Sequence, residues 1–495
     1  MQYEQIDFPI WLNKIFCFHY FRFISSRFQL KYLLKFKYSH INKEPKLIQT
    51  PINSKVVKEK IDEMNLKCIG QASIRELNRI VDNIEKATGD KFIRMEMGVP
   101  GLDPPTIEVE AEILALKRGV GSKYPPFDGI PELKREISRL IKNFMNINVS
   151  EEGCFPTVGS MQGCYMSLMI SSRRKINKDK ILFIDPGFPV NKRQVKVLGL
   201  QSINFDIYEY RGEKLRDKLE SYLKGGDIAA LIYSNPNNPS WIIFSEAELR
   251  IIGELATRYD VIVLEDLAYF GMDFRKDYSK PGEPPYIPTV ARYTDNYILL
   301  ISSSKSFSLA GQRIGMTAIS DKLFNSKEDN LEKYFGSRIF GKAYIFGAMY
   351  ALTSGVSHSI QYGLAALLKA VNDGKFHFLD YVKEYAYRAK AMKKLFTDNG
   401  FKIVYDMDES EPIADGFYFT LSYPGFSGNE LVEELLYYGI SSISLSTTGS
   451  DRLEGIRACV SLISRDQLPL LEERLKKFKH DHDSGFRIVT TSADS

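Results

Sequence analysis

The chain has 495 residues, a net charge of +4 and 26% charged residues. This length exceeds what one small hydrophobic core can organise, so it predicts two domains with extensions. The nearly balanced charge gives no indication of nucleic-acid binding. The five cysteines are odd in number and share no metal-binding spacing, which favours a reducing compartment and hence the cytoplasm; they are Cys17, Cys68, Cys154, Cys164 and Cys459.

The first fifty residues differ from the rest because Phe and Tyr alternate there with Lys and Arg. Such a segment could adhere to an anionic membrane surface, but its longest uncharged run, residues 15–21, is too short for a stable membrane span. It also lacks the order of a signal peptide. We favour a third interpretation, in which Met64 is the true start and residues 1–63 are an extension that is non-native or disordered. An amphipathic helical pattern begins directly afterwards, at residues 65–79.

Apolar strand-like runs then alternate with helical patterns, which predicts a parallel sheet with right-handed crossovers. The helical patterns include residues 132–141 and 246–256. Gly159 opens another helix after a short strand-like stretch. The free N–H groups at such a helix start can bind phosphate, although an ordinary helix cap is the simpler interpretation. The next strand-like run, residues 182–189, ends in a turn where Phe188 either stacks on an aromatic ring or fills the core.

Two further strand-like runs end in polar residues. Residues 231–241 stop in a turn where Asn238 lies between two prolines, which restrict its backbone and position its amide. In residues 261–269 an apolar strand-like run is followed by the acid Asp266, and Tyr269 comes three residues later. Sites in parallel α/β sheets lie at the carboxyl ends of strands, and an aspartate there can keep a pyridine nitrogen protonated. A solvent-facing acid is the alternative for Asp266 considered alone.

The most informative segment runs from residue 297 to residue 315. An apolar strand leads through Ser302 and two further serines to Lys305, with Arg313 eight residues on. A lysine attacks carbonyls only when its pKa is lowered by burial or by a neighbouring cation. Arginine matches phosphate oxygens bidentately. A carbonyl and a phosphate on one ligand describe pyridoxal phosphate, whereas a solvated Ser/Lys loop is the plain alternative.

The C-terminal third changes pattern. Residues 339–398 have helical spacing almost throughout and predict a long helix linking the two domains. Strands are then expected at residues 416–422 and 455–463, with a helix at 429–438 between them, so the smaller domain is also α/β. The His480-Asp-His482 pair is interpreted as part of a solvated polar tail, and no metal site is expected.

In chain order these segments resemble the fold type I pyridoxal-phosphate enzymes, specifically the class I/II aminotransferases, over about residues 93–475. The resemblance implies an aspartate aminotransferase-like α/β fold and an aldimine between Lys305 and the cofactor. It implies that Asp266 pairs with the pyridine nitrogen and that Tyr269 and Asn238 bond the ring hydroxyl. It further implies ring contact by Phe188 and a phosphate site formed by Ser160, Met161, Ser302 and Arg313.

The resemblance also assigns residues that local pattern alone does not. Gly98 would lie beside the substrate carboxylate, which Arg457 would bind together with Asn238. Tyr124 would reach the phosphate of the partner subunit, which implies a homodimer with shared active sites. The resulting division is an extension (1–63), a helical arm (64–96), a large cofactor domain (97–338), linking helices (339–400), a small domain (401–480) and a polar tail (481–495).

One departure from the family pattern stands out. The family commonly has Asn-Pro-Thr-Gly where this chain has Asn238-Pro-Ser-Trp241, so an indole replaces a glycine. If that glycine has positive φ, Trp241 is strained; alternatively the turn is rearranged, or the indole lines the substrate pocket. No second substrate-binding arginine is identified, so a preference for dicarboxylic amino acids is not supported.

The expected function is transfer of an amino group between an amino acid and a 2-oxo acid. A pyridoxal-phosphate lyase or decarboxylase on the same fold is the first alternative, and a non-catalytic protein that keeps the fold is the second. A transcription factor is disfavoured because no helix-turn-helix pattern precedes Lys91.

Overall fold

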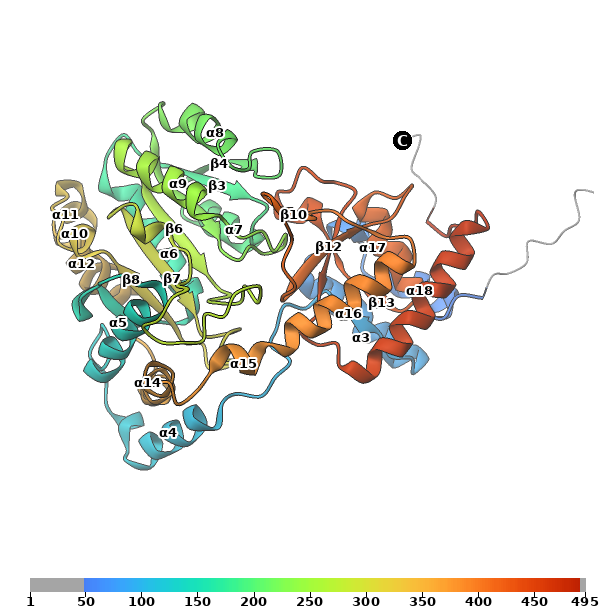
Figure 1. Cartoon of the computed structure of the whole chain (residues 1–495), viewed down its shortest axis with the longest axis horizontal. Helices are drawn as coiled ribbons and strands as arrows, with labels where there is room; N and C mark the ends of the chain where they lie inside the picture. Colours follow the sequence, from blue (N-terminus) through green and yellow to red (C-terminus); the bar gives the residue numbers. More distant parts are fainter. Residues whose placement is uncertain (1–48, 490–495) are drawn as a thin grey trace, which may run out of the picture. The chain divides into compact units, whose positions relative to one another are not determined.

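The computed structural model describes residues 49–489. The predictions for the aromatic N-terminal segment, including Cys17, and for the last residues of the polar tail lie outside this range. Within it, the chain forms a large sheet domain and a smaller one (Figure 1).

The large domain is built on a seven-stranded sheet in the order β2-β8-β7-β6-β5-β3-β4. The strands from β7 to β4 run parallel, whereas β8 is antiparallel to both of its neighbours. The sheet is therefore mainly parallel, as expected. Its strands are β2 (Cys154–Thr157), β3 (Lys180–Asp185), β4 (Gln201–Asp206), β5 (Ile228–Ser234), β6 (Ile262–Leu267), β7 (Tyr297–Ser302) and β8 (Gly315–Ile319).

Both faces of this sheet are buried, because alternate residues of its strands enter two different hydrophobic clusters. In β6, for example, Val263 points into one cluster and Leu264 into the other. Burial on both faces explains the near-continuous apolar runs of the sequence. The helices of this domain are α4 (Thr106–Lys117), α5 (Pro131–Met145), α6 (Gly159–Arg174), α7 (Pro189–Val197), α8 (Lys214–Leu223), α9 (Glu246–Arg258), α10 (Asp321–Phe324) and α11 (Asp329–Phe335).

The predicted long linking helix is instead a series of shorter helices. The chain leaves helical geometry at Ser354, which has a φ of 53°, and again at Gly374, with a φ of 68°. Left-handed residues end helices, and the apolar periodicity continues across such breaks without revealing them. The series comprises α12 (Phe340–Lys342), a π-helix (Ala343–Met349), α13 (Tyr350–Thr353), α14 (His358–Asn372), α15 (Phe378–Val382) and α16 (Glu384–Asp398).

The small domain contains a four-stranded antiparallel sheet in the order β14-β15-β12-β9, accompanied by α16 and two further helices. Two short pairs complete its strands: β10 with β11, and β13 with β1 from the start of the described chain. Its elements are β9 (Lys402–Ile403), β10 (Met407–Asp408), β11 (Glu411–Pro412), β12 (Tyr418–Ser422), α17 (Gly428–Tyr437), β13 (Ile440–Ser441), β14 (Ile443–Ser444), β15 (Ile456–Cys459) and α18 (Leu468–Asp483).

The N-terminal part corrects one expectation. Thr50–Asp62, placed in the unfolded extension, belongs to the folded body: α2 (Ser54–Asp62) packs on α3 (Ile74–Thr88), and Ile52 and Val57 are fully buried. The capping box of Ser73 and Glu76 fixes the start of α3, and β1 (Ile93–Arg94) follows it. The amphipathic pattern predicted this second helix but not the first.

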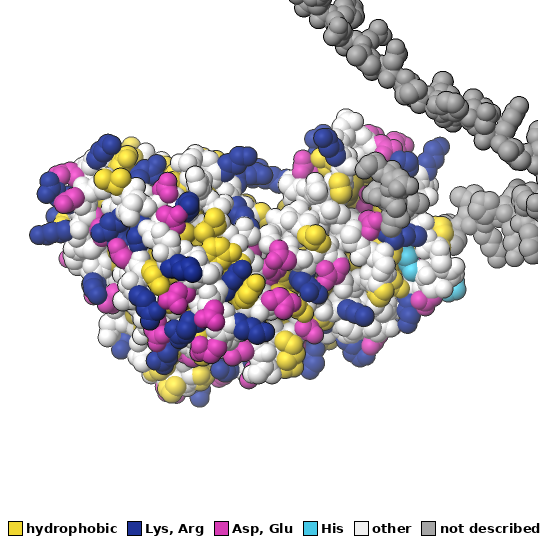
Figure 2. Space-filling view, turned by 90° about the horizontal axis from the view of Figure 1, so that it is seen from above, with side chains coloured by type: hydrophobic (Ala, Val, Ile, Leu, Met, Phe, Trp, Pro, Cys, Tyr) yellow, Lys and Arg dark blue, Asp and Glu magenta, His cyan; other side chains and the backbone are white. Residues whose placement is uncertain are grey.

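The predicted polar tail is also shorter than expected, since α18 continues to Asp483. His482 stacks on Phe478 at 4.0 Å and lies 3.1 Å from a carboxylate oxygen of Glu434, so it is a packed residue rather than a solvated one. In the part of the chain that the structure describes, no helix is both long and apolar enough to cross a membrane. Basic and acidic side chains are interspersed over the face seen in Figure 2.

Candidate active site

A cavity of about 410 Å³ lies at the carboxyl ends of β5, β6 and β7, where the sequence placed its polar motifs. Every predicted site residue except Tyr124 lines it. These residues are Gly98, Ser160, Met161, Phe188, Asn238, Asp266, Tyr269, Ser302, Lys305, Arg313 and Arg457.

Asp266 is carried into the cavity by β6. Its Oδ1 atom is buried and has no hydrogen-bond partner among the described residues. Burial raises the pKa of this carboxyl to about 7, and the nearby Lys305 opposes that rise only in part. A buried acceptor without a donor is costly unless a ligand supplies the donor. A ligand atom that donates a hydrogen bond to Oδ1 would remove this cost.

Lys305 follows β7 after three serines and faces the same cavity. Burial lowers the pKa of its amine, and the guanidinium groups of Arg313 and Arg457 add to this effect, while Cys459 and Asp266 oppose it. The lowering increases the fraction of neutral amine, which is the nucleophilic and proton-accepting form.

The start of α6 lies close to Arg313 and to β8, the strand that follows Lys305. The residues Gly159, Ser160 and Met161 begin the helix, and the positive end of the helix dipole lies there. A Cβ atom added to Gly159 would lie 2.7 Å from Nη2 of Arg313, and one added to Gly315 would lie 2.6 Å from the backbone nitrogen of Ser160. The two glycines thus bring an arginine and free N–H groups close together.

Arg457 extends from β15 in the small domain and is only 2% exposed. Its Nη2 donates to the carbonyl oxygen of Glu96 at 2.6 Å, and its Nη1 donates to Oδ1 of Asn238 at 3.3 Å. The guanidinium carbon lies 4.6 Å from the ring centre of Tyr418. Its Nε has no hydrogen-bond partner in the described structure, so the guanidinium retains capacity for an anion.

Two tyrosines connect the two halves of the cavity. Tyr269, from the large domain, donates a hydrogen bond to the Tyr418 hydroxyl at 3.0 Å. A Cβ atom added to Gly98 would lie 2.2 Å from that same hydroxyl, so the chain needs glycine there. Phe188, at the start of α7, lines the cavity as well.

The structure decides between the interpretations of Trp241. Its φ of 64° is left-handed, so the residue adopts the backbone that favours glycine. The side chain is fully buried and is absent from the cavity lining; it packs behind Tyr269 with ring centres 5.2 Å apart. Trp241 thus has a strained backbone, and its indole does not line the cavity.

Several lining residues were not identified from the sequence. Arg75 extends from the first turn of α3, and Tyr418 comes from β12. Cys164 and Asn191 also line the cavity. Arg75 lay inside a segment recognised only as amphipathic, and nothing local indicates that α3 borders the cavity. Tyr418 lies within the strand predicted at residues 416–422, but the sequence does not show which way its side chain points.

Tyr124 lies outside the cavity and is 91% exposed. Four large apolar residues of the neighbouring α4 are also exposed: Ile107, Ile113, Leu114 and Leu116.

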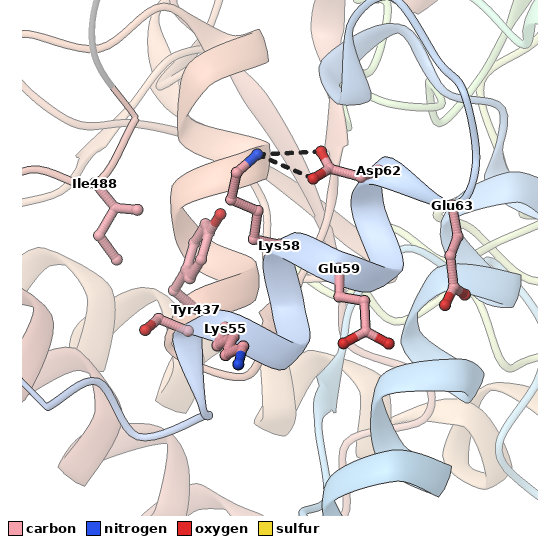
Figure 3. Close-up of a pocket in the computed structure, with 8 residues that line it drawn as sticks. Lys55, Lys58, Glu59, Asp62, Glu63, Tyr437 and Ile488 are labelled. Carbon is pink, nitrogen blue, oxygen red and sulfur yellow. Dashed lines mark hydrogen bonds and ion pairs between the residues drawn. The ribbon is translucent and has the colours of Figure 1, made fainter.

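A larger pocket, of about 660 Å³, lies between α2, Tyr437 and Ile488 (Figure 3). It is open and carries charges that pair with one another, such as Lys58 with Asp62 at 3.1 Å. Among the described residues, no buried polar atom without a hydrogen-bond partner lines this pocket, whereas Asp266 and Arg457 contribute such atoms to the cavity of Lys305. We therefore take the cavity of Lys305 as the candidate active site.

Residues 90–475 match the family described as Aminotransferase class I and II. The chain belongs to this family. It is 28% identical over 257 residues to a probable aspartate aminotransferase of Methanocaldococcus jannaschii, covering 52% of this chain and 63% of that protein. It is 24% identical over 267 residues to the S-alkyl-thiohydroximate lyase SUR1 of Arabidopsis thaliana, covering 51% and 55%. The matched part thus spans about six tenths of these curated relatives.

Among solved structures, an alanine aminotransferase from Pyrococcus furiosus superimposes with a TM-score of 0.67 at 21% identity, covering 83% of this chain and 97% of that one. At this identity the likeness shows the fold, which is the predicted aspartate aminotransferase-like α/β fold.

Class I and II aminotransferases depend on pyridoxal phosphate, and the cavity fits this cofactor. The orphaned Oδ1 of Asp266 suits a protonated pyridine nitrogen. The start of α6 with Arg313 suits a phosphate, and the amine of Lys305 suits the aldehyde. The cofactor prediction is confirmed by the family membership and is consistent with this donor set.

Proposed function

We propose that this chain is an aminotransferase that moves an amino group between an amino acid and a 2-oxo acid. The observation that carries the proposal is one cavity holding an amine of lowered pKa, an orphaned aspartate and an arginine with free donor capacity. Pyridoxal phosphate, when bound, supplies an electron sink for the bond that breaks at the substrate Cα.

The residues of the chain would divide the work between them. Asp266 would hold a proton on the pyridine nitrogen, and Tyr269 with Asn238 would bond the ring hydroxyl. Phe188 would contact the ring. The phosphate would be held by the backbone at Ser160 and Met161 and by the side chains of Ser302 and Arg313.

Arg457 and Asn238 would bind the substrate carboxylate beside Gly98. Such two-point binding fixes the direction of the Cα–H bond, and orientation of this kind is a large part of rate enhancement. The neutral amine of Lys305 would then act as general base and take the proton from Cα. The protonated amine would act as general acid and deliver that proton to a second atom of the bound reactants. Its lowered pKa supports this role.

We also propose a homodimer in which Tyr124 of the partner subunit reaches the phosphate. The 91% exposure of Tyr124 and the group of exposed apolar side chains on α4 support this arrangement, because apolar side chains grouped on one surface gain from burial at an interface. A cytoplasmic role in amino-acid metabolism is proposed on the free thiols of Cys68, Cys154, Cys164 and Cys459.

The test is the visible absorption of the purified full chain with pyridoxal phosphate, before and after a pool of amino acids is added. Conversion of the bound cofactor to pyridoxamine phosphate, absent from a Lys305→Ala variant, supports the proposal. If the bound aldehyde form persists while product is released, the chain is a decarboxylase or a lyase, the latter being the activity named for its Arabidopsis relative. A protein that develops no cofactor band contradicts the assignment of Lys305.

A further inference from the structure

The loop around Trp241 is held rigidly from both sides. The backbone N–H of Trp241 donates to the carbonyl oxygen of Asn237 at 3.0 Å, and the N–H of Asn237 donates to the carbonyl oxygen of Ile242 at 2.9 Å. The amide of Asn237 also donates to the carbonyl oxygen of Pro186 at 2.8 Å. These bonds hold Trp241 in a left-handed conformation that side-chain-bearing residues rarely adopt.

The indole fits this place because of a glycine far along the chain. A Cβ atom added to Gly416 would lie 2.0 Å from Cε2 of Trp241 and 2.2 Å from its Nε1. No side chain larger than hydrogen is compatible with the indole in its present position. The strained tryptophan and the missing side chain at Gly416 therefore form a complementary pair.

The contacts of the indole lead directly to the substrate side of the cavity. It packs edge-on against Tyr269 at 5.2 Å and against Tyr418 at 6.2 Å between ring centres. Both tyrosines line the cavity and share a hydrogen bond, and the Tyr418 ring lies under the guanidinium of Arg457. An edge-on aromatic contact restricts the tilt of a ring as well as burying it.

We propose that Trp241 is a positioning residue, which sets the rings of Tyr269 and Tyr418 and thereby the placement of Arg457. The inference deepens the proposed function and rests on it for the roles of Tyr269 and Arg457. Trp241 does not touch the cavity itself, so its effect passes through these side chains.

The variants separate positioning from simple core packing. Trp241→Gly suits the left-handed backbone but removes the support, whereas Trp241→Phe keeps an aromatic edge and serves if the glycine variant does not fold. Phe478→Leu is the matched control, because Phe478 is fully buried in α18 and its aromatic contacts are with other residues of the small domain. All are studied as the full-length chain, with pyridoxal phosphate bound except where its affinity is measured.

Three readouts are used: KM and kcat with L-aspartate, L-glutamate and L-alanine, the affinity of cofactor-free protein for pyridoxal phosphate, and the pH midpoint of the visible absorbance of the bound cofactor. For Trp241→Gly we expect KM to rise roughly tenfold with a smaller fall in kcat, and the pH midpoint to move by roughly half a unit. In Trp241→Phe, KM and the pH midpoint should lie close to the wild-type values, and Phe478→Leu should change neither KM nor the pH midpoint.

A cycle with Tyr269→Phe decides whether the effect passes through that hydroxyl. If Trp241 acts by positioning it, the Trp241→Gly shift of the pH midpoint should vanish in the Tyr269→Phe background. A shift that persists there at full size overturns the proposal, and so does an unchanged midpoint in Trp241→Gly. Should the wild-type chain convert no amino acid, the proposed function fails, while the pH midpoint of the bound cofactor still decides the role of Trp241.

Discussion

The buried carboxyl of Asp266 gives a prediction that concerns stability as well as catalysis. In the cofactor-free protein its pKa rises from 3.8 to about 7 because burial disfavours the charged form. The folded chain therefore holds a proton that the unfolded chain releases between about pH 4 and pH 7. By linkage, folding stability must fall as the pH rises through this window.

The size of the effect follows from the displacement of the pKa. A change from 3.8 to about 7 corresponds to about 4 kcal/mol above pH 7, at about 1.4 kcal/mol for each pKa unit. Because the carboxylate borders a cavity that admits water, we expect about 2–4 kcal/mol. Asp266→Asn removes the charge and should make the cofactor-free protein more stable at pH 8, with a clearly smaller gain at pH 5.

The assay is urea unfolding of cofactor-free wild type and variant at both pH values, followed by circular dichroism. Asp398→Asn is the matched control, because Asp398 lies on α16 with its side chain 54% exposed and should change stability little at either pH. With the cofactor bound, the order should reverse, since Asp266→Asn loses the pairing with the ring nitrogen and turnover should fall severely. Equal stability differences at pH 5 and pH 8 would refute the linkage argument, and unchanged turnover would mean that the ring nitrogen is paired elsewhere.

Three other substitutions test the remaining roles. Lys305→Ala should abolish amino-group transfer and the visible cofactor band while circular dichroism remains that of the wild type; activity in this variant would remove the central assignment. Arg457→Ala should raise KM for every amino acid by a factor that corresponds to roughly 2 kcal/mol or more of binding free energy, because a buried charged donor is lost. An unaltered KM would mean that another residue binds the substrate carboxylate. Arg75→Ala tests whether this cavity arginine meets a side-chain carboxylate of the substrate. It should raise KM for aspartate and glutamate more than KM for alanine, by a factor that corresponds to roughly 0.5–1 kcal/mol of binding free energy, as for an exposed ion pair. Equal changes for all three amino acids would show that Arg75 meets no substrate side chain.

Much of the site could be predicted because its residues follow buried strands directly. Asn238, Asp266 and Lys305 come just after or at the ends of β5, β6 and β7, and neighbouring parallel strands bring their carboxyl ends to one edge. Local sequence therefore determines both the residue and its approximate place. The roles assigned to these residues remain predictions.

Other features depend on contacts between distant segments. Arg75 lines the cavity from α3, a helix far from β5, β6 and β7 in the sequence, and the course of the linking helices depends on single left-handed residues such as Ser354. The sequence around Trp241 does not show where its indole packs, because the space for the indole is left by Gly416, in another domain. Neither residue alone shows that the pair fits.

Some of the strained or unpaired groups of this chain lie at or near the cavity of Lys305. Trp241, Ser308 and Arg313 have left-handed backbones, and Asp266 and Arg457 keep buried polar atoms without partners. Each such feature costs free energy in the folded chain, by about 1–3 kcal/mol for a strained backbone or an unpaired buried group. Asp266 and Arg457 direct an unpaired acceptor and an unpaired donor at the same cavity, which is a physical argument, independent of the family match, that this cavity binds a polar ligand.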